Sequence, residues 1–159
     1  MTNDAAKETD DDRMKNELIP PQIRGVSASW KNHVNALADF FESVGETPLP
    51  VEQHLHAGVY TRTGCQKAGV ACATALVKVP TQLIVCGRAR IYCENDVFEV
   101  NGYRVLEGLP GRQMVVVTLE DTWATVLFAT NAKTVEEAEA EAVGEEVAVR
   151  LTNHKLLEA

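Results

Sequence analysis

Large apolar residues recur at steps of three and four between Ser29 and Val44, as they do on one face of an α-helix. The stripe consists of Trp30, Val34, Leu37, Phe41 and Val44. Ser27 or Ser29 can cap the start of this helix, and Gly45 can end it ahead of two prolines. We expect the stripe to pack either on the main sheet or on the same helix of a second subunit.

Between Val51 and Thr130 the pattern changes to short runs rich in Val, Ile, Thr and aromatic residues, which are typical of β-strands. The runs are GVACATALVKV, QLIVCG, RARIYC, DVFEV, YRVL, QMVVVTL and WATVLFAT. Turn signals separate them at Glu94-Asn95-Asp96, Asn101-Gly102 and Leu109-Pro110-Gly111. Asn101-Gly102 predicts a two-residue hairpin turn, because both residues tolerate a positive φ. Many short strands at this spacing predict an antiparallel sandwich or barrel.

A second helix is predicted near the end of the chain. Thr134 and Glu137 form a capping box, and the run EEAEAEA is strongly helix-forming and expected to be solvated. The predicted organisation is therefore an acidic, mobile N-terminal segment and connector (1–25), a helix (26–47), a β-barrel (48–131) and an acidic helical C-terminal segment (132–159). This is a mainly β fold with one N-terminal and one C-terminal helix.

Charge is unevenly distributed along the 159 residues, which carry a net charge of −8. Between Gly58 and Arg112 seven basic residues stand against four acidic ones, a net charge of +3. The basic residues are Arg62, Lys67, Lys78, Arg88, Arg90, Arg104 and Arg112. Overall acidity argues against general nucleic-acid binding, whereas the basic middle segment permits a small anionic ligand.

Two observations bear on location. No run approaches the roughly 20 apolar residues of a membrane helix, and the polar start MTNDAAKETDDDRMKNE lacks the apolar core of a signal peptide. We therefore expect a cytoplasmic protein that does not bind membranes. Its four cysteines, Cys65, Cys72, Cys86 and Cys93, are expected to be buried, reduced thiols, since no pair has Cys-x-x-Cys spacing.

The stretch from about His54 to Thr130 resembles a small cupin, in particular the cupin-like proteins of tailed phages and prophages. The phrases behind this are GVYTR (58–62), AG (68–69), CG before RARIY (86–92), LPGRQ (109–113) and LEDTWATVLFAT (119–130). The resemblance implies a jelly-roll barrel, usually dimeric, with a central cavity between two sheets. A phage protein would act in the cytoplasm of the bacterial host.

Metal-binding cupins carry His-x-His followed by Glu, and later a His after Pro-x-Gly. Here VKVPTQL places Val77 and Val79 at the first pair, and LPGRQM places Met114 at the later position. Valine has no lone pair to give, and a thioether is a poor ligand for hard or borderline metals. The sequence thus departs from the metal pattern, and no cofactor is expected.

His54 and His56 are a separate His-x-His pair, whose side chains share one face of a strand. A stable metal site usually needs three or four protein ligands, and no further ligands support this pair. We expect it to lie on the surface or to line the cavity, with a metal site as the weaker alternative.

Binding is favoured over catalysis, because no Gly-x-Ser-x-Gly, phosphate loop or dinucleotide fingerprint is present. Arg88 and Arg90 share a strand face, and guanidinium groups match phosphates or carboxylates and stack on bases. The candidate ligand-binding residues are Arg62, Arg88, Arg90, Tyr60, Tyr92, Tyr103, His54 and His56. An outward, solvated arginine pair is the alternative.

The leading hypothesis is a non-catalytic, homodimeric protein that holds a small anion in the barrel cavity. Nucleotides fit this chemistry, and capture of a nucleotide signal of host defence is a conceivable purpose. The alternative is a structural or protein-interaction module acting through the helix of Trp30, Leu37 and Phe41. A metal-dependent cupin enzyme comes third.

Overall fold

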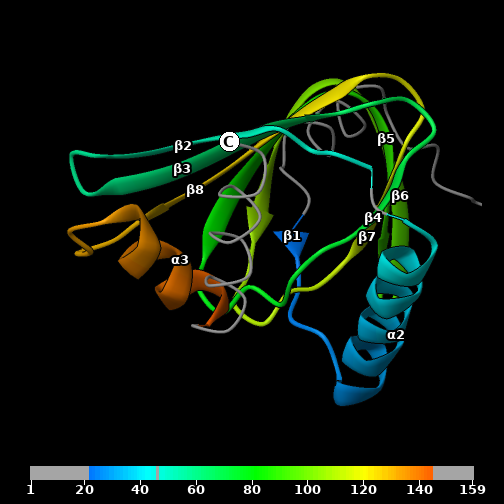
Figure 1. Ribbon diagram of the computed structural model, residues 1–159, viewed down its shortest axis with the longest axis horizontal. Coiled ribbons are helices and arrows are strands. Elements are labelled where there is room, and N and C mark those ends of the chain that lie inside the picture. Colours follow the sequence, from blue (N-terminus) through cyan, green and yellow to red (C-terminus); the bar gives the residue numbers. More distant parts are fainter. Residues whose placement is uncertain (1–21, 46, 145–159) are drawn as a thin grey trace, which may run out of the picture.

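The computed structural model describes residues 22–45 and 47–144, which form a curved β-sheet with one helix before it and one after it (Figure 1). The strands are β1 (Gln22–Ile23), β2 (Val51–His56), β3 (Val59–Gln66), β4 (Ala71–Ala73), β5 (Thr81–Cys93), β6 (Asp96–Gly108), β7 (Val115–Thr118) and β8 (Thr122–Ala129). The helices are α2 (Ala28–Val44) and α3 (Val135–Val143). The predicted mainly β fold with two flanking helices is confirmed. The acidic run at 10–12 and the tail beyond residue 144 lie outside the described residues.

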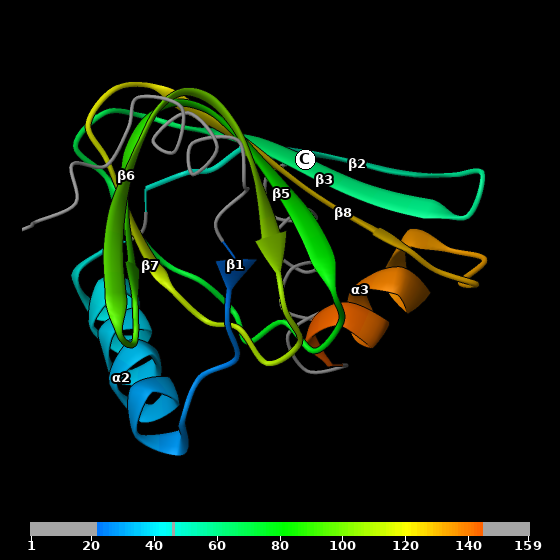
Figure 2. The same cartoon turned by 180° about the vertical axis from the view of Figure 1, so that it is seen from behind.

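A long hairpin of β5 and β6 forms the body of the sheet. The two strands pair from Thr81 opposite Gly108 to Cys93 opposite Asp96. The first half of β5 also pairs with β8, and its second half pairs with β7. The hairpin therefore curves round and folds the sheet over into a barrel, as seen from behind in Figure 2.

The change of partner along β5 occurs at Gly87, whose φ is 140°. A Cβ atom there would lie 2.6 Å from Thr122 Oγ1 and 2.8 Å from the carbonyl oxygen of Asp121, so no larger residue fits. Gly102 of β6 faces Gly87 in register. The predicted hairpin turn at Asn101-Gly102 is therefore wrong, because both residues lie inside β6. The β5–β6 turn lies at Glu94-Asn95 instead, at another of the predicted turn signals.

The remaining strands extend the sheet in the order β1-β6-β5-β8-β3-β2, and β4 pairs with β7. β2 and β3 form a hairpin that projects from the barrel (Figure 1) and turns at Ala57-Gly58, where φ is 51° and 73°. β1 lies within the segment predicted as a connector. Its Ile23 pairs in parallel with Gly108 and is 1% exposed, so the end of the predicted connector is part of the barrel.

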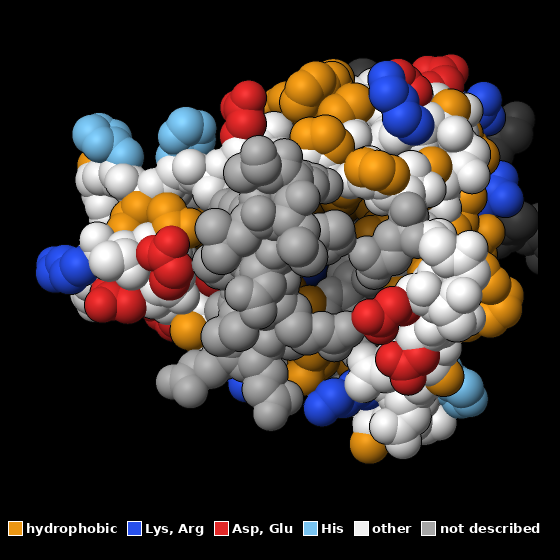
Figure 3. Space-filling model, viewed as in Figure 1, with side chains coloured by type: hydrophobic (Ala, Val, Ile, Leu, Met, Phe, Trp, Pro, Cys, Tyr) orange, Lys and Arg blue, Asp and Glu red, His pale blue; other side chains and the backbone are white. Residues whose placement is uncertain are grey.

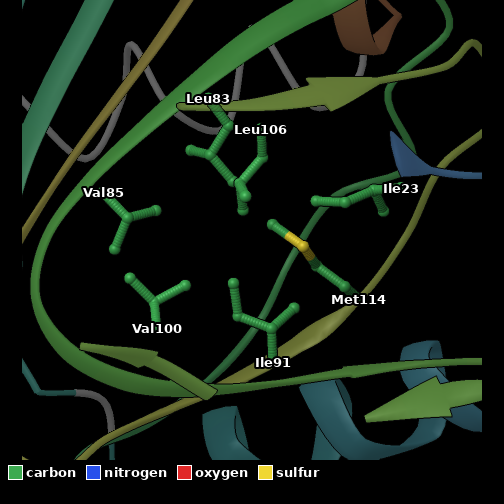
Figure 4. Close-up of a cluster of buried hydrophobic side chains, with 7 residues drawn as sticks. All are labelled: Ile23, Leu83, Val85, Ile91, Val100, Leu106 and Met114. Atoms are coloured by element: carbon green, nitrogen blue, oxygen red, sulfur yellow. The ribbon is translucent and has the colours of Figure 1, made fainter. Parts of the chain in front are cut away.

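The barrel is closed by apolar side chains that point inward from its strands (Figure 4). Their buried set is Ile23, Leu83, Val85, Ile91, Val100, Leu106 and Met114. Met114, which stands where a metal-binding cupin would have a histidine, is one of these core side chains. This interior is therefore an apolar core along most of its length, stabilised by the removal of its side chains from water.

Helix α2 packs on the barrel beside β4. The Ser27 hydroxyl caps it by accepting from the Trp30 N–H, and the Trp30 indole N–H donates to the Gln113 carbonyl oxygen at 3.0 Å. Val34 is 2% exposed. The apolar stripe thus takes the first of its two predicted partners, the sheet of its own chain. None of the helices in the described part of the chain has the length and apolarity needed to cross a membrane.

Helix α3 begins at its predicted cap, since the Thr134 hydroxyl accepts from the Glu137 N–H. The helix packs on the β2–β3 hairpin and β8 through a second apolar cluster, which consists of Tyr60, Phe128, Ala138 and Ala142. The prediction of a solvated EEAEAEA helix is therefore wrong for one face. Glu139 lies on that face and is 4% exposed.

Candidate functional site

The two histidines of β2 lie on the outer surface. His54, His56 and Glu52 are exposed, while the residues that alternate with them are partly covered by the chain. Figure 3 shows histidine side chains standing free of the surface above the β2–β3 hairpin. Within residues 22–45 and 47–144 no group of three or more His, Cys, Asp or Glu is placed to hold a metal ion. A cavity-lining position for this pair is excluded.

Arg88 and Arg90 also lie outside the barrel. They share a face, as predicted, but the apolar residue between them, Ala89, is the one that is fully buried. Arg88 Nε donates to Glu99 Oε1 at 2.8 Å, and Arg90 Nη2 donates to Glu99 Oε2 at 3.3 Å. The two arginines hold the pKa of the Glu99 carboxyl below its usual value. Of the two placements considered for this pair, the structure therefore has the outward one, and the arginines do not line the barrel interior.

Two of the predicted tyrosines belong to this outer surface as well. Tyr92 follows Arg90 on the same face of β5, and its side chain raises the pKa of Arg90 by hydrogen bonding, ahead of the contribution from Glu99. Tyr103 of β6 is 64% exposed. The eight candidate residues therefore do not converge on one cavity.

Tyr60 and Arg62 do converge, on a carboxylate of the protein itself. The Tyr60 hydroxyl donates to Glu139 Oε1 at 3.1 Å, Arg62 Nη1 donates to the same oxygen at 3.3 Å, and Gln53 Nε2 donates to it as well. Burial, and then the nearby Glu139 charge, raise the pKa of Tyr60 to about 12. The anion held by this arginine and tyrosine is thus supplied by α3.

The charged group buried most deeply among the described residues is Arg112, in the loop between β6 and β7, at 1% exposure. Its Nε and Nη2 donate to the Thr81 hydroxyl at 3.1 and 2.9 Å. No carboxylate of the described residues lies within 4.0 Å of the guanidinium. Burial lowers the pKa of Arg112 to about 10, so the group remains charged at neutral pH.

The backbone at Gly108 lies directly against the Arg112 side chain. Thr81 and Gly108 pair across the ends of β5 and β6, and β1 closes the other side of Gly108 through Ile23. A Cβ atom on Gly108 would lie 2.7 Å from Arg112 Cδ and closer still to Nε. Only a glycine at this position leaves room for the arginine.

Arg112 faces one titratable group in the core. Burial raises the pKa of the Cys93 thiol, and the positive charge of Arg112 opposes that rise. All four cysteines are free. Three of them are partly buried, whereas Cys86 is exposed, which corrects the prediction that all would be buried.

Sequence reasoning counted Arg112 only as one of seven positive charges. The signal that could have found it is its place in LPGRQM, two residues before the position at which a metal-binding cupin carries a histidine. Glu139 was missed because its neighbours in EEAEAEA are also acidic, so that nothing in the local pattern marks it out.

No protein-family model matches the sequence, and no curated protein sequence matches it. A cupin superfamily protein from Desulfitobacterium hafniense is similar in structure, with 11% identity and a TM-score of 0.47 over 55% of this chain and 82% of its own. A conserved protein of unknown function from Streptococcus pyogenes has 9% identity and a TM-score of 0.45 over 55% and 79%. A cupin 2 conserved barrel domain protein from Salinispora arenicola has 14% identity and a TM-score of 0.43 over 60% and 86%. These similarities concern the fold alone; the structure of this chain itself is a mainly β sheet with a helix before it and a helix after it.

Proposed function

We propose that this protein is a binding protein that holds the carboxylate or phosphate group of a small molecule at Arg112. The observation that carries this proposal is a charged guanidinium, 1% exposed, whose partner in the described residues is a hydroxyl rather than a carboxylate. Burying an unpaired charge costs several kcal/mol. A bound anion would offset that cost and accept the remaining N–H donors of the planar fork.

The other arginines considered as ligand-binding residues support this choice by contrast. Arg62 is engaged by Glu139, and Arg88 and Arg90 are engaged by Glu99. An external anion would have to displace these internal carboxylates, whereas at Arg112 it would compete with no carboxylate of the described residues. A role in host defence through nucleotide capture, and a phage origin, stay predictions that rest on the sequence resemblance.

The experiment is a thermal unfolding series with inorganic phosphate, acetate, adenosine monophosphate and a cyclic dinucleotide. We expect at least one of these to stabilise the protein, by about 2.7 kcal/mol when its concentration is 100 times its Kd. Arg112→Lys keeps the charge but loses the fork, and should abolish the response. Arg88→Gln removes an exposed guanidinium and should keep it.

Two results would overturn the proposal. One is that none of the four anions stabilises the protein at any concentration up to about 10 mM, at which even weak binding sites are occupied. The other is that Arg112→Lys and the parent chain respond equally, which would place the anion elsewhere. A response to phosphate and acetate alike would identify a general oxyanion site, whereas a response to the nucleotides alone would show that the base is also recognised.

The alternative of a protein-interaction module has one observation in its favour. On α2, Phe40 and Val44 are 57% and 63% exposed. However, the predicted stripe packs inward through Trp30 and Val34 on its own sheet, so the interaction surface named from the sequence is largely occupied within the chain.

A further inference from the structure

The Thr81 hydroxyl occupies one edge of the Arg112 guanidinium. Nε and Nη2 both donate to Thr81 Oγ1, at 3.1 and 2.9 Å. A guanidinium has five N–H donors in one plane, so within the described part of the chain the Nη1 group and the second hydrogen of Nη2 are left for a ligand. These donors form the end of the fork. Two parallel donors of this kind match the two oxygens of a carboxylate.

The charge at this site suits a carboxylate better than a phosphate monoester. A carboxylate has one negative charge, which one guanidinium neutralises. A phosphate monoester carries a charge of about −1.5 to −2 at pH 7 and has three strong acceptor oxygens. Besides burial, the group that acts on the pKa of Arg112 is the Cys93 thiol, and no second cation among the described residues contributes. A phosphate would therefore keep excess negative charge away from water, which is unfavourable.

The side chains next to this site on the inner face of the barrel are apolar. Alternate residues of an extended chain share a face, so the inward neighbours of the site lie two positions from Arg112, from Thr81 and from Gly108. These neighbours are Met114, Leu83 and Leu106, all in the buried core. Ile23, the register partner of Gly108, is a fourth. Arg112 thus adjoins an interior with apolar walls.

The buried polar side chains of the described residues give a ligand no second anchor beside Arg112 and Thr81. The others are bonded to backbone carbonyl groups or to side chains of α2, α3 and β3. They are Gln113, Thr118, Thr122, Thr130 and Glu139. Ribose hydroxyls or the polar edge of a base buried here would lose hydrogen bonds to water without replacing them. The part of the ligand beyond its anionic group is therefore expected to be apolar.

We propose, on the basis of the function proposed above, that the ligand is a small monocarboxylic acid with an apolar body. Its carboxylate accepts from the free end of the Arg112 fork, and its hydrocarbon part lies against Met114. Figure 4 shows Met114 pointing into the ring of the other core side chains. Because methionine is flexible and adapts to irregular spaces, it is the core side chain that most readily makes room for this body.

The test is isothermal titration calorimetry of the full chain with acetate, butanoate and hexanoate. Removal of one methylene group from water raises an affinity about fourfold. We therefore expect the affinity to rise about 15-fold with each of the two steps in this series. Hexan-1-ol, which lacks the carboxylate, should bind at least about tenfold more weakly than hexanoate. Butyl phosphate and adenosine monophosphate should be weaker by at least the same factor, about tenfold.

Two arginine variants connect the affinity to the site. Arg112→Lys keeps a positive charge but loses the planar fork, and should lower the hexanoate affinity at least about tenfold. Arg88→Gln removes an exposed guanidinium and should leave it unchanged. A hexanoate affinity that is equal in Arg112→Lys and in the parent would place the acid elsewhere and overturn the proposal.

The ligand series separates failure of this inference from failure of the proposed function. Equal affinities for acetate and hexanoate would show that the hydrocarbon part is not bound, and the inference would fail while an anion site remains. Tighter binding of a phosphate than of hexanoate would have the same consequence. Absence of binding by every acid and every phosphate would overturn the proposed function together with the inference.

Substitution of Met114 tests where the hydrocarbon part lies. Met114→Ala enlarges the space, so the ratio of the octanoate affinity to the hexanoate affinity should rise at least about fourfold. Val97→Ala, at an exposed position of β6, is the control and should keep the parent's ratio. A folded Met114→Ala protein with the parent's ratio would overturn the proposal. Loss of a core side chain destabilises a protein, and the acid series on the parent chain decides the proposal if this variant does not fold.

Discussion

Among the described residues two charged side chains are buried, Glu139 and Arg112, and their surroundings differ in one respect. Glu139, at 4% exposure, is surrounded by donors from β2 and β3, including the guanidinium of Arg62. Arg112, at 1% exposure, is given the Thr81 hydroxyl and no described carboxylate. The first charge is neutralised within the chain and holds α3 on the hairpin. The second keeps an unneutralised charge away from water, which is the reason we propose that it binds an anion from outside.

The largest effect is expected from removing the neutralised charge. Glu139→Ala leaves Arg62 without its carboxylate and the Tyr60 hydroxyl without its acceptor, and should lower the free energy of unfolding by about 4 kcal/mol. Urea denaturation measures the loss. Glu136→Ala, on the exposed face of the same helix, is the matched control and should change it by less than about 0.5 kcal/mol. Equal effects of the two substitutions would show that the Glu139 contacts contribute nothing.

The next effect separates the two regions by pH. The pKa of Tyr60 is raised to about 12, so the folded state keeps a proton that the unfolded state loses above pH 10. Its contribution to stability is present below pH 10 and is lost as the pH rises toward 12. The pKa of Arg112 is lowered to about 10, so the folded state releases a proton that the unfolded state keeps. Its penalty is present below pH 10 and is relieved above it.

The two effects oppose each other, and each changes the free energy of unfolding by about 3 kcal/mol, at 1.36 kcal/mol for each unit by which a pKa is shifted. Substituting one of the two groups leaves the effect of the other visible. Between pH 10 and 12, Arg112→Met should lose more stability than the parent chain, and Tyr60→Phe should lose less. Urea denaturation at pH 9, 10, 11 and 12 covers about the range in which the two groups titrate, and gives the slope of stability against pH for each protein. Slopes that are equal in the three proteins would mean that neither group titrates in this range.

A smaller effect is expected from crowding the arginine. Gly108→Ala places a methyl group against Arg112 and should destabilise the protein by about 2 kcal/mol. The double variant with Arg112→Met should recover at least half of that loss, because a flexible thioether can move aside. Additive effects in urea denaturation would show that the strain at Gly108 does not involve Arg112.

The smallest effect has the opposite sign. Arg112→Met removes an unneutralised buried charge and should raise the free energy of unfolding of the anion-free protein by about 1 kcal/mol. The same variant should no longer be stabilised by anions. A large destabilisation at neutral pH would mean that the hydrogen bonds to Thr81 outweigh the charge, and that Arg112 is a structural residue.

The fold was more predictable than the candidate site, for identifiable reasons. The helix stripe and the Ser27 cap are local patterns, and both are present in the structure. QLIVCG and RARIYC were separated in the prediction, although they form one strand, because Gly87 bends the chain without breaking its pairing. Asn101-Gly102 has turn chemistry, but it stands opposite that bend, which is a long-range fact.

The site depended on contacts that local patterns do not contain. Alternation with Ala89 and Ile91 could have shown that Arg88 and Arg90 point outward. Convergence of Tyr60 and Arg62 on Glu139 requires α3 to pack on a hairpin that lies almost eighty residues earlier in the chain. Helical and strand periodicities describe only neighbouring residues and do not reach over such a distance. Burial of Arg112 requires the ends of β5 and β6 to meet around it.

The most direct test of the central claim is the ¹⁵N NMR signal of the Arg112 Nε–H during titration with inorganic phosphate, acetate and adenosine monophosphate. Arg112→Lys assigns the signal by removing it. The account predicts a saturable shift of this signal with at least one anion, while the Arg88 signal moves less. A signal from Arg112 that stays fixed through all three titrations would contradict the account, and would make this arginine a part of the scaffold.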